Sequence, residues 1–453
     1  MAILAAHLND AGIVVCDDEQ IRYREPGFAL LEDEHLTTGS PAYDTARLKP
    51  RHIHNHFWSS LSTEALADRR FHHLSAADLA SRQLEQIWKR AAQPGDQLVI
   101  AVPAYMTNEN LGLLLGIAAE LDIPVTAMVD AAVAATRRHY LHAVPVHIDL
   151  GLHSATLTRL LQEGEVQVER AAVIDDCGLL NLQENWLRTI AEVFVQQSRF
   201  DPLHTAETEQ VLQDRMPAWL DVAAAAETVV MEIEYRGVAH RAEIESLHLV
   251  AAAAPVYQNL VSNLRALYRA EDTPAIQLSE RAARMPGLAE TLKTRVGGET
   301  YLLEAGATAR GLIKRIPRQQ PSGPLTLRRH LPWDQAPVEV DVSRSTSGGQ
   351  PTHLLFGDRA RCLGPSPLVL GTQPDDGERW LDLGQDMPGV SRRHCALTTE
   401  NQQCIITDFS RYGTFLNGHR IDGSAVLQTG DIIRIGTPGY EMKLIAAEQR
   451  DGA

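Results

Sequence analysis

The segment 388-PGVSRRHC-395 places a hydroxyl group, two guanidinium groups and an imidazole in one short loop. Ser391 and His394 could act as nucleophile and base, but no acidic partner or oxyanion motif accompanies them, so the sequence predicts no catalytic residue here. A phosphate clamp is a second possibility, because hydroxyl and arginine side chains donate strong hydrogen bonds to a dianion. An ordinary polar surface loop is the third.

Residues 351–447, which contain this loop, have the pattern of an all-β domain. Short β-favouring runs such as LVLGT, HCALTT and DIIRIG are separated by Gly, Asn, Asp and Pro at close, regular intervals. This spacing predicts a β-sandwich. The dipeptide Asn417-Gly418 predicts a two-residue hairpin within it.

The run from Leu368 to Gly436 resembles the forkhead-associated (FHA) domain, a β-sandwich whose loops bind phosphothreonine peptides. Four motifs in the family's order carry the resemblance: LVLG (368–371), VSRRH (390–394), DFSRYGTFLNG (408–418) and TGDIIRIG (429–436). The resemblance implies phosphopeptide-binding positions at Ser391, Arg392, Arg411 and Tyr412. It implies structural positions at Gly371, His394, Gly413, Thr414, Asn417 and Gly418.

Two departures from the family pattern concern phosphate binding. The family's first loop has Gly-Arg where this chain has Gly371-Thr372, and its third loop has an asparagine where this chain has Tyr412. A hydrogen bond to a charged group contributes roughly 1.5–3 kcal/mol, so the missing arginine should weaken phosphopeptide binding about 10–100-fold. Arg392 or Arg411 could replace it. A sandwich that binds its partner without phosphate remains the alternative.

Residues 1–313 alternate buried strands with helices. The near-continuous apolar runs QLVIAVPA (97–104) and VPVHIDL (144–150) are typical of strands covered on both faces. Residues 228–244 predict a hairpin that turns at Arg236-Gly237, and a long helix follows over about 245–270. The pattern predicts an α/β architecture with more than one sheet.

Residues 314–350 differ from both flanking regions. They are rich in Pro, Gly, Ser and Arg and have little hydrophobic periodicity. Such composition predicts a linker, with a short strand at Val338–Val342. The predicted organisation is therefore an N-terminal domain (1–313), a linker (314–350), a sandwich domain (351–447) and a tail (448–453).

The N-terminal domain resembles the actin and DnaK-like ATPase superfamily. Weak matches occur in the family's order: LVIAVPAYMTNEN (98–110), MVDAAVAAT (128–136), HIDLGLHSATLTRL (147–160), LSERAARMPGLAETL (278–292) and EAGATARGL (304–312). The resemblance implies a two-lobed α/β ATPase fold, followed by the all-β FHA-like sandwich.

The nucleotide site that this resemblance implies is damaged. Phosphate loops use glycine because backbone N–H groups must approach the phosphates closely, and magnesium needs fixed carboxylates. Here residues 7–11 are His-Leu-Asn-Asp-Ala where the family has Asp-Leu-Gly-Thr-Thr. Leu152-His153 replace two glycines of the second loop, and Glu280-Arg281 replace a Gly-Gly pair.

We therefore predict a pseudo-ATPase that needs no cofactor. Asp149 and Gly151 survive in the second loop, and Asp130 could stand in for the family's catalytic-site glutamate, one methylene shorter. A residual nucleotide site at these three residues, binding ATP with magnesium, is the alternative. It would make the chain a working ATPase that its FHA domain targets.

The stretch RHIHNHFW (51–58) offers a different chemistry. On a strand, His52, His54 and His56 would share one face, and imidazoles spaced in this way can bind zinc. No cysteine or carboxylate partner is evident, so the sequence favours a structural role and predicts no metal site.

The composition limits the partners. The chain has 453 residues and a net charge of −16; the charges of residues 314–453 cancel, so residues 1–313 carry the excess. An acidic surface repels the phosphate backbone of a nucleic acid, so the sequence predicts no nucleic-acid partner. The sequence has no run of about 18 apolar residues, which is the length needed to span a membrane. Five scattered cysteines indicate a reducing cytoplasm. The predicted function is a cytoplasmic adaptor or scaffold for protein partners, with threonine phosphorylation of the partner as an open question.

Overall fold

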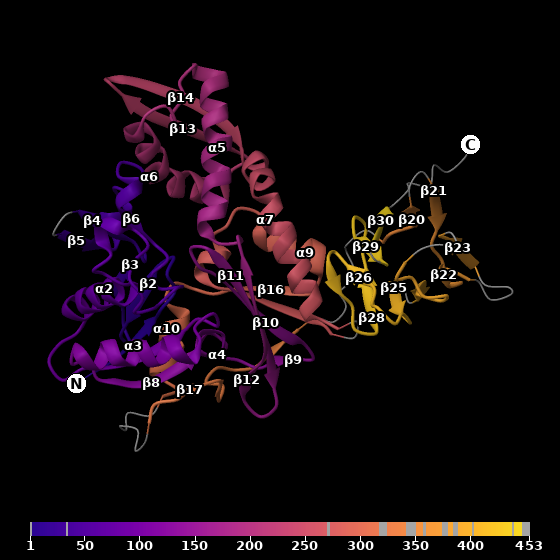
Figure 1. The fold of residues 1–453 in the computed structure, drawn as a ribbon, viewed down its shortest axis with the longest axis horizontal. Coiled ribbons are helices and arrows are strands. Elements are labelled where there is room, and N and C mark those ends of the chain that lie inside the picture. Colours follow the sequence, from indigo (N-terminus) through magenta and orange to yellow (C-terminus); the bar gives the residue numbers. More distant parts are fainter. Residues whose placement is uncertain are drawn as a thin grey trace. The chain divides into compact units, whose positions relative to one another are not determined.

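The computed structural model describes residues 2–32, 35–269, 272–316, 324–340, 350–356, 359–373, 379–383, 388–400, 403–436 and 439–445. The chain divides into two compact units (Figure 1). The N-terminal unit comprises Met1–Leu260, Ala275–Glu290 and Thr300–Glu339. The C-terminal unit comprises Val261–Pro274, Thr291–Glu299 and Val340–Ala453. The predicted tail, residues 448–453, lies outside the described residues.

The first sheet of the N-terminal unit has the strand order β17-β8-β7-β1-β2-β3. Its strands β1, β2 and β3 form an antiparallel meander, and β1 pairs in parallel with β7, which pairs in parallel with β8. The bounds are β1 Ile3–His7, β2 Ile13–Cys16, β3 Ile21–Glu25, β7 Gln97–Val102, β8 Val125–Asp130 and β17 Leu327–Arg328.

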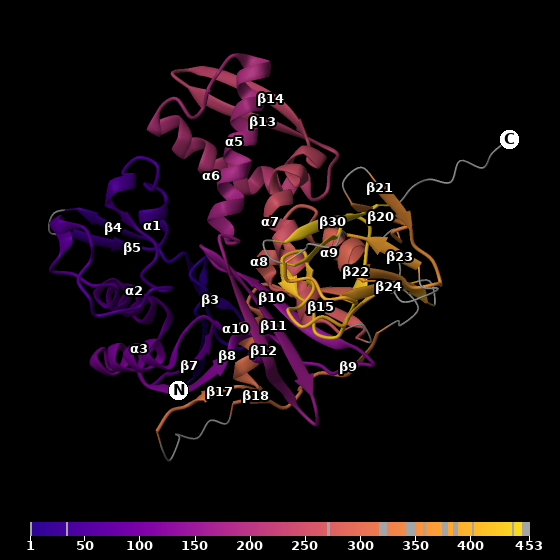
Figure 2. The ribbon, with the colours of Figure 1, turned by 45° about the vertical axis from the view of Figure 1, so that its right-hand side comes forward.

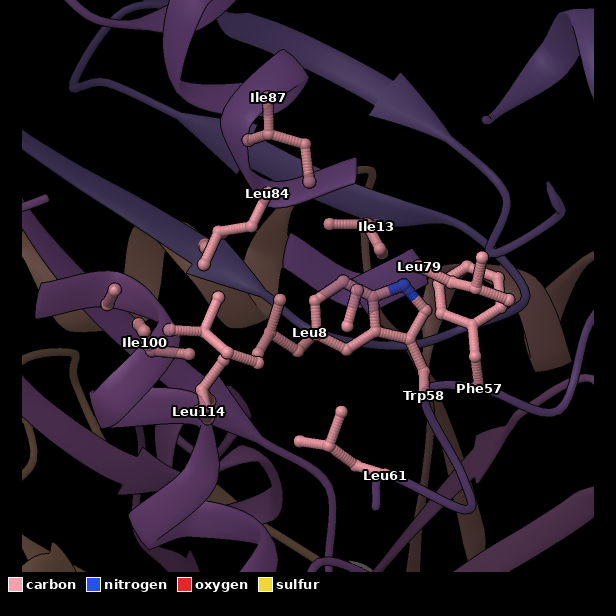
Figure 3. Close-up of a cluster of buried hydrophobic side chains, with 14 of the residues drawn as sticks. Leu8, Ile13, Phe57, Trp58, Leu61, Leu79, Leu84, Ile87, Ile100 and Leu114 are labelled. Carbon is pink, nitrogen blue, oxygen red and sulfur yellow. The ribbon is translucent and has the colours of Figure 1, made fainter. Parts of the chain in front are cut away.

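Apolar side chains cover both faces of this sheet. Leu4 and Ala6 of β1 join one core cluster, whereas Ile3 and Ala5 join the other, because successive side chains alternate between the faces. The first cluster contains residues of α2 (Ala76–Ala91) and α3 (Asn108–Glu120), and the second contains residues of α4 (Ala131–Ala135) and α10 (Ala307–Ile313). Figure 3 shows Trp58 among the leucines and isoleucines of the first cluster. The near-continuous apolar pattern of residues 97–104 is thereby explained.

The second sheet has the order β16-β15-β10-β11-β12-β18. Its central strand β10 starts a second antiparallel meander, β10-β11-β12, just as β1 starts the first. The bounds are β10 Val144–Leu150, β11 Ser154–Gln162, β12 Val166–Asp175, β15 Pro274–Leu278, β16 Glu299–Leu302 and β18 His330–Leu331. The predicted strand at 144–150 is confirmed, and so is an α/β architecture with more than one sheet.

Between β12 and β15 the chain forms a helical layer with a long hairpin. Helices α5 (Leu179–Ser198) and α6 (Ala206–Ala223) pack on the hairpin strands β13 (Thr228–Tyr235) and β14 (Val238–Glu245), and Figures 1 and 2 both show them side by side. Arg236 and Gly237 have φ values of 52° and 77°, which is the left-handed geometry of a two-residue hairpin turn. The hairpin is confirmed at the predicted position, and the predicted helix is α7 (Ser246–Leu267).

Short elements complete this unit. A three-stranded sheet has the order β5-β4-β6, and β19 pairs in parallel with β9. The bounds are β4 Ala29–Glu32, β5 His35–Thr38, β6 Ile53–His54, β9 Tyr140–Leu141, β19 Val338–Glu339, α1 Ser40–Tyr43 and α8 Glu280–Ala283, with 3-10 turns at Pro50–His52 and Arg69–Phe71. Helix α9 (Leu288–Val296) begins in this unit and continues into the C-terminal unit at Thr291.

Within the expected linker 314–350, the described residues 324–340 do not form a free arm. Strand β17 pairs with β8, β18 pairs with β12, and β19 pairs with β9, so this segment extends the sheets of the N-terminal unit. The boundary predicted at residue 313 is therefore too early, because two-residue edge strands bond through the backbone and need no side-chain periodicity. The predicted strand at Val338–Val342 is Val338–Glu339 in the described residues; 317–323 and 341–349 lie outside them.

The described strands of the C-terminal unit form two sheets, with orders β21-β20-β30-β29-β26-β27 and β23-β22-β24-β25-β28. One hydrophobic cluster, which includes Leu354, Leu370, Leu397 and Ile433, draws residues from both sheets, as in a sandwich. The bounds are β20 His353–Phe356, β21 Arg359–Cys362, β22 Leu368–Gly371, β23 Arg379–Asp382, β24 Cys395–Glu400, β25 Gln403–Asp408, β26 Phe415–Leu416, β27 His419–Arg420, β28 Ser424–Leu427, β29 Ile432–Ile435 and β30 Tyr440–Ile445. The all-β pattern is confirmed.

Gly371 at the end of β22 is closely approached by the backbone of another loop. A Cβ atom there would lie 2.0 Å from the carbonyl oxygen of Arg392. We expect Gly371→Ala to lower the free energy of unfolding by about 1–3 kcal/mol, because backbone must move to relieve the overlap. Urea denaturation should show this loss, whereas Gly364→Ala, whose Cβ would meet only Nη1 of Arg379 at 3.6 Å, serves as the control. Equal stability of the two variants would contradict this interpretation.

Candidate functional site: the recognition loops and the N-terminal cavity

His394 connects two loops at one end of the sandwich. Its Nδ1 accepts a hydrogen bond from the backbone N–H of Ser391 (3.0 Å), and its Nε2 lies 3.3 Å from the carbonyl oxygen of Gly413. Because Nδ1 is an acceptor, Nε2 must carry the proton of a neutral ring. Burial lowers the pKa of His394, which keeps the ring neutral. His394 contacts the backbone of Ser391 and not its hydroxyl, so the two residues do not form a nucleophile–base pair.

Asp408, at the end of β25, organises the loop that follows. Its carboxylate accepts hydrogen bonds from the backbone N–H of Ser410 (2.9 Å) and the hydroxyl of Thr414 (2.8 Å), and the Ser410 hydroxyl accepts one from the N–H of Gly413 (2.7 Å). Burial raises the pKa of Asp408, but these hydrogen bonds outweigh it and lower the pKa. Sequence reasoning missed Asp408 and Ser410 as determinants of the loop, although both lie within the DFSRYGTFLNG motif.

The groups left outside this framework are polar and aromatic. The Ser391 hydroxyl accepts a long hydrogen bond from the backbone N–H of Arg411 (3.3 Å). Arg392 and Arg411 are exposed, and no carboxylate of the described residues forms an ion pair with either. The ring of Tyr412 is exposed, with the Arg411 guanidinium 5.9 Å from its centroid. One hydroxyl and two arginines that no described carboxylate neutralises thus lie on two adjacent loops.

Asn417 and Gly418 form the hairpin between β26 and β27. Their φ values of 50° and 85° confirm the predicted two-residue turn. The Asn417 amide donates to Asp431 (2.9 Å), and its oxygen accepts from the N–H of Ile432 (2.9 Å). The Asn417 side chain therefore connects the hairpin to the start of β29, which is a structural role.

The N-terminal unit contains a second candidate site, a cavity of about 330 Å³ whose lining includes His7, Gly12, Asp149 and Arg281. Nε2 of His7 lies 3.1 Å from a carboxylate oxygen of Asp149. Burial raises the pKa of Asp149, but the neighbouring His7 outweighs it and the net pKa is lowered. Asp130 instead caps α4 by accepting the backbone N–H groups of Ala132 and Val133 (2.9 and 3.4 Å).

The two loops beside this cavity are tied together by side chains. The Asn9 amide donates to the carbonyl oxygen of Leu150 (2.9 Å), and the Asp10 carboxylate accepts the backbone N–H of Leu152 (2.8 Å). Gly151 lies close to the Asp10 side chain, since a Cβ atom on Gly151 would be 2.9 Å from the same Asp10 oxygen. Burial raises the pKa of Asp10 to about 6. The carboxylate thus occupies one backbone donor of the loop that carries Asp149.

Arg281 packs against the loop that contains Asn9, Asp10 and Gly12. A Cβ atom on Gly12 would lie 2.2 Å from Nη2 of Arg281, so the guanidinium packs directly on the Gly12 backbone. The adjacent Glu280 is bound in a bidentate pair by Arg24 (2.5 and 2.7 Å). Within the described part of the chain, no group of three or more His, Cys, Asp or Glu residues is arranged to hold a metal ion.

The histidines of residues 51–58 do not share one strand face. His52 belongs to a 3-10 turn and its Nδ1 lies 2.7 Å from the carbonyl oxygen of Leu31, whereas β6 contains only Ile53 and His54. His56 stacks on His153 with ring centroids 3.4 Å apart. The three imidazoles therefore have different surroundings.

His147 gives the N-terminal unit a testable pH dependence. It is fully buried beside His7 and Asp149, and burial lowers its pKa to about 4 from an ordinary value of 6.5. Between pH 6.5 and 4, His147 is protonated in the unfolded chain but stays neutral in the folded protein. The free energy of unfolding therefore decreases as the pH falls from 6.5 toward 4. Asp10 acts in the opposite sense over a similar window, because its pKa is raised.

Comparison with a His147→Gln variant separates the two effects. Between pH 6.5 and 4, we expect the wild type to lose on the order of 3 kcal/mol more unfolding free energy than the variant. Urea denaturation at a series of pH values measures this difference. Parallel curves for the two proteins would contradict the assignment.

Comparison with known proteins identifies the class of the C-terminal module. Residues 378–436 match the family model of the FHA domain, and a search of curated proteins found no match. The chain therefore carries an FHA domain, a protein-interaction module of the phosphopeptide-binding class. The matched segment contains both recognition loops described above. Among the described residues, no helix is both long and apolar enough to cross a lipid bilayer.

Proposed function

We propose that this protein is an adaptor that binds a threonine-phosphorylated partner through its FHA loops. The observation that carries the proposal is the combination of the Ser391 hydroxyl with Arg392 and Arg411 on two loops held together by His394. A phosphate dianion needs several charge-assisted donors from a rigid framework. The two arginines are exposed and carry charges that no carboxylate of the described residues neutralises.

The proposal also accounts for Thr372, which stands where the FHA family has an arginine. Thr372 follows β22, and its backbone N–H donates to the Ser391 carbonyl oxygen (3.2 Å), so it belongs to the same loop cluster. A threonine hydroxyl cannot supply the charge of a guanidinium. We assign that charge to Arg392 and Arg411.

We further propose that the N-terminal unit is a degenerate member of the actin and DnaK-like superfamily. The repeated meander in its two sheets supports the fold. Two contacts support the loss of ATPase function. The hydrogen bond from Leu152 to Asp10 uses a loop N–H group and a carboxylate that phosphate and magnesium would need, and the Arg281 guanidinium packs on the Gly12 backbone of the other loop. Such a unit would present surfaces to partners without hydrolysing ATP.

A peptide library tests the adaptor proposal. The full-length chain should be retained on an immobilised degenerate phosphothreonine library and not on the matching threonine library. Peptides recovered from the retained fraction would define the sequence around the phosphothreonine. Equal retention on the two libraries would replace this proposal with a phosphate-independent sandwich.

Thermal melting tests the pseudo-ATPase proposal separately. A ligand at about 100 times its Kd adds roughly 2.7 kcal/mol to the stability of the state that binds it. We expect millimolar ATP with magnesium to leave the melting temperature of the N-terminal unit unchanged, because Asp10 already occupies the backbone N–H of Leu152 in the second loop. A rise of several degrees together with phosphate release would favour the working ATPase instead.

A further inference from the structure

The cavity of the N-terminal unit is mainly apolar. Its lining includes these aromatic, aliphatic and thioether side chains: Phe28, Tyr43, Trp186, Met216, Leu220 and Met285. A volume of about 330 Å³ is at the small end of the range for sites that enclose organic molecules. Aromatic and thioether side chains favour a flat apolar ligand, which can stack on the rings and contact the polarisable sulfur atoms.

Arg281 is a charged residue of this cavity that forms no ion pair with a described residue. Three carboxylates lie close enough to influence it: Asp149, Glu280 and Asp10. Among the described residues, however, none of them forms an ion pair with it. Its Nε atom is buried and has no hydrogen-bond partner.

The neighbouring carboxylates already have other partners. Asp149 faces His7, Glu280 is bound by Arg24, and Asp10 accepts the N–H of Leu152. They are therefore poorly placed to pair with Arg281 or to coordinate a metal ion. The buried Nε–H donor without an acceptor costs free energy, and an anionic ligand group could accept parallel hydrogen bonds from Nε and a terminal nitrogen of Arg281.

We propose that this cavity binds a small organic anion with a flat apolar body, and that it does so without a metal ion. The apolar body lies beside Tyr43 and Met285, which are only half-buried, and the acid group pairs with Arg281. The shared chemistry of the ligand is one carboxylate, sulfonate or phosphate monoester attached to a ring system. This site is separate from the FHA loops, so the proposal stands or falls independently of phosphopeptide binding.

The fluorescent probe 8-anilinonaphthalene-1-sulfonate has this chemistry and reports binding directly. Titrated into the full-length protein with EDTA present, it should give one saturable site. Arg281→Gln should weaken that site about 10–100-fold, because it removes a charged hydrogen bond. Arg281→Lys should retain part of the affinity, and Arg170→Gln, at an exposed arginine of β12, should retain all of it.

A neutral probe separates a binding role of Arg281 from a structural one. N-phenyl-1-naphthylamine lacks the sulfonate and should bind the wild type and the Arg281→Gln variant equally. Loss of the neutral probe in both Arg281 variants would show that the arginine only maintains the cavity, and would overturn the proposal. Unchanged sulfonate binding in Arg281→Gln, non-saturable binding in the wild type, or displacement by ATP only when magnesium is present would also overturn it.

Discussion

Replacing Arg315 with methionine is expected to lower the free energy of unfolding of the N-terminal unit by about 3–5 kcal/mol. Its guanidinium is buried and donates to the carbonyl oxygens of Gly311 (2.7 Å), Thr136 (3.0 Å), Val133 (3.1 Å) and Ala134. Three of these carbonyls are at the C-terminal side of α4, where a helix leaves acceptors without internal partners. Methionine would fill the space and leave the carbonyls unsatisfied.

Lys314 provides a matched control for this experiment. It precedes Arg315 directly but is exposed, so Lys314→Met should change the unfolding free energy by less than about 0.5 kcal/mol. Urea denaturation followed by tryptophan fluorescence would measure both variants. A loss below about 1 kcal/mol for Arg315→Met would mean that water replaces the lost donors and that the segment after α10 contributes little to this unit.

Replacing Arg392 with alanine is expected to weaken phosphothreonine-peptide binding about 10–100-fold. Arg392 is exposed and directly follows Ser391 in the chain, and its loss leaves Arg411 as the remaining arginine of the two loops that we assign to phosphate. Arg411→Ala should have an effect of similar direction, and the double variant should bind at the level of the unphosphorylated peptide. Fluorescence anisotropy with one labelled peptide measures the whole series.

The control for this series is Arg361→Ala. Arg361 is an exposed arginine on β21, outside both loops, so its removal changes the net charge of the domain by the same amount. Its affinity should stay within about two-fold of wild type, since exposed charges at a distance are screened by salt. If Arg361→Ala and Arg392→Ala weakened binding equally, the effect would be one of overall charge and not of a phosphate contact.

The strongly patterned elements could be predicted from the sequence. The runs at 97–104 and 144–150 are apolar enough to indicate doubly covered strands, and Arg236-Gly237 and Asn417-Gly418 are turn dipeptides with one dominant geometry. The FHA loops were located for a related reason. Their motif residues interact within a short stretch of chain, as His394 does with Ser391.

What the sequence did not reveal depends on contacts between distant residues. Arg315 lies in a Pro- and Gln-rich stretch typical of a linker, and only the folded chain brings it to carbonyls more than 170 positions away. The Asp10–Leu152 hydrogen bond likewise joins residues 142 positions apart. Residues 7–11 indicated a damaged loop, but not that a carboxylate would bind the opposite loop. The sequence shows where such a substitution lies, but not which distant residue its side chain contacts.

Isothermal titration of the full-length protein with one library-selected peptide, in its phosphothreonine and threonine forms, tests the central claim most directly. The account predicts that the phosphorylated form binds at least about 10-fold more tightly, because each charged hydrogen bond to the phosphate contributes roughly 1.5–3 kcal/mol. It also predicts that the Ser391→Ala, Arg392→Ala double variant loses this difference. Equal affinities for the two peptide forms in the wild-type protein would contradict the account.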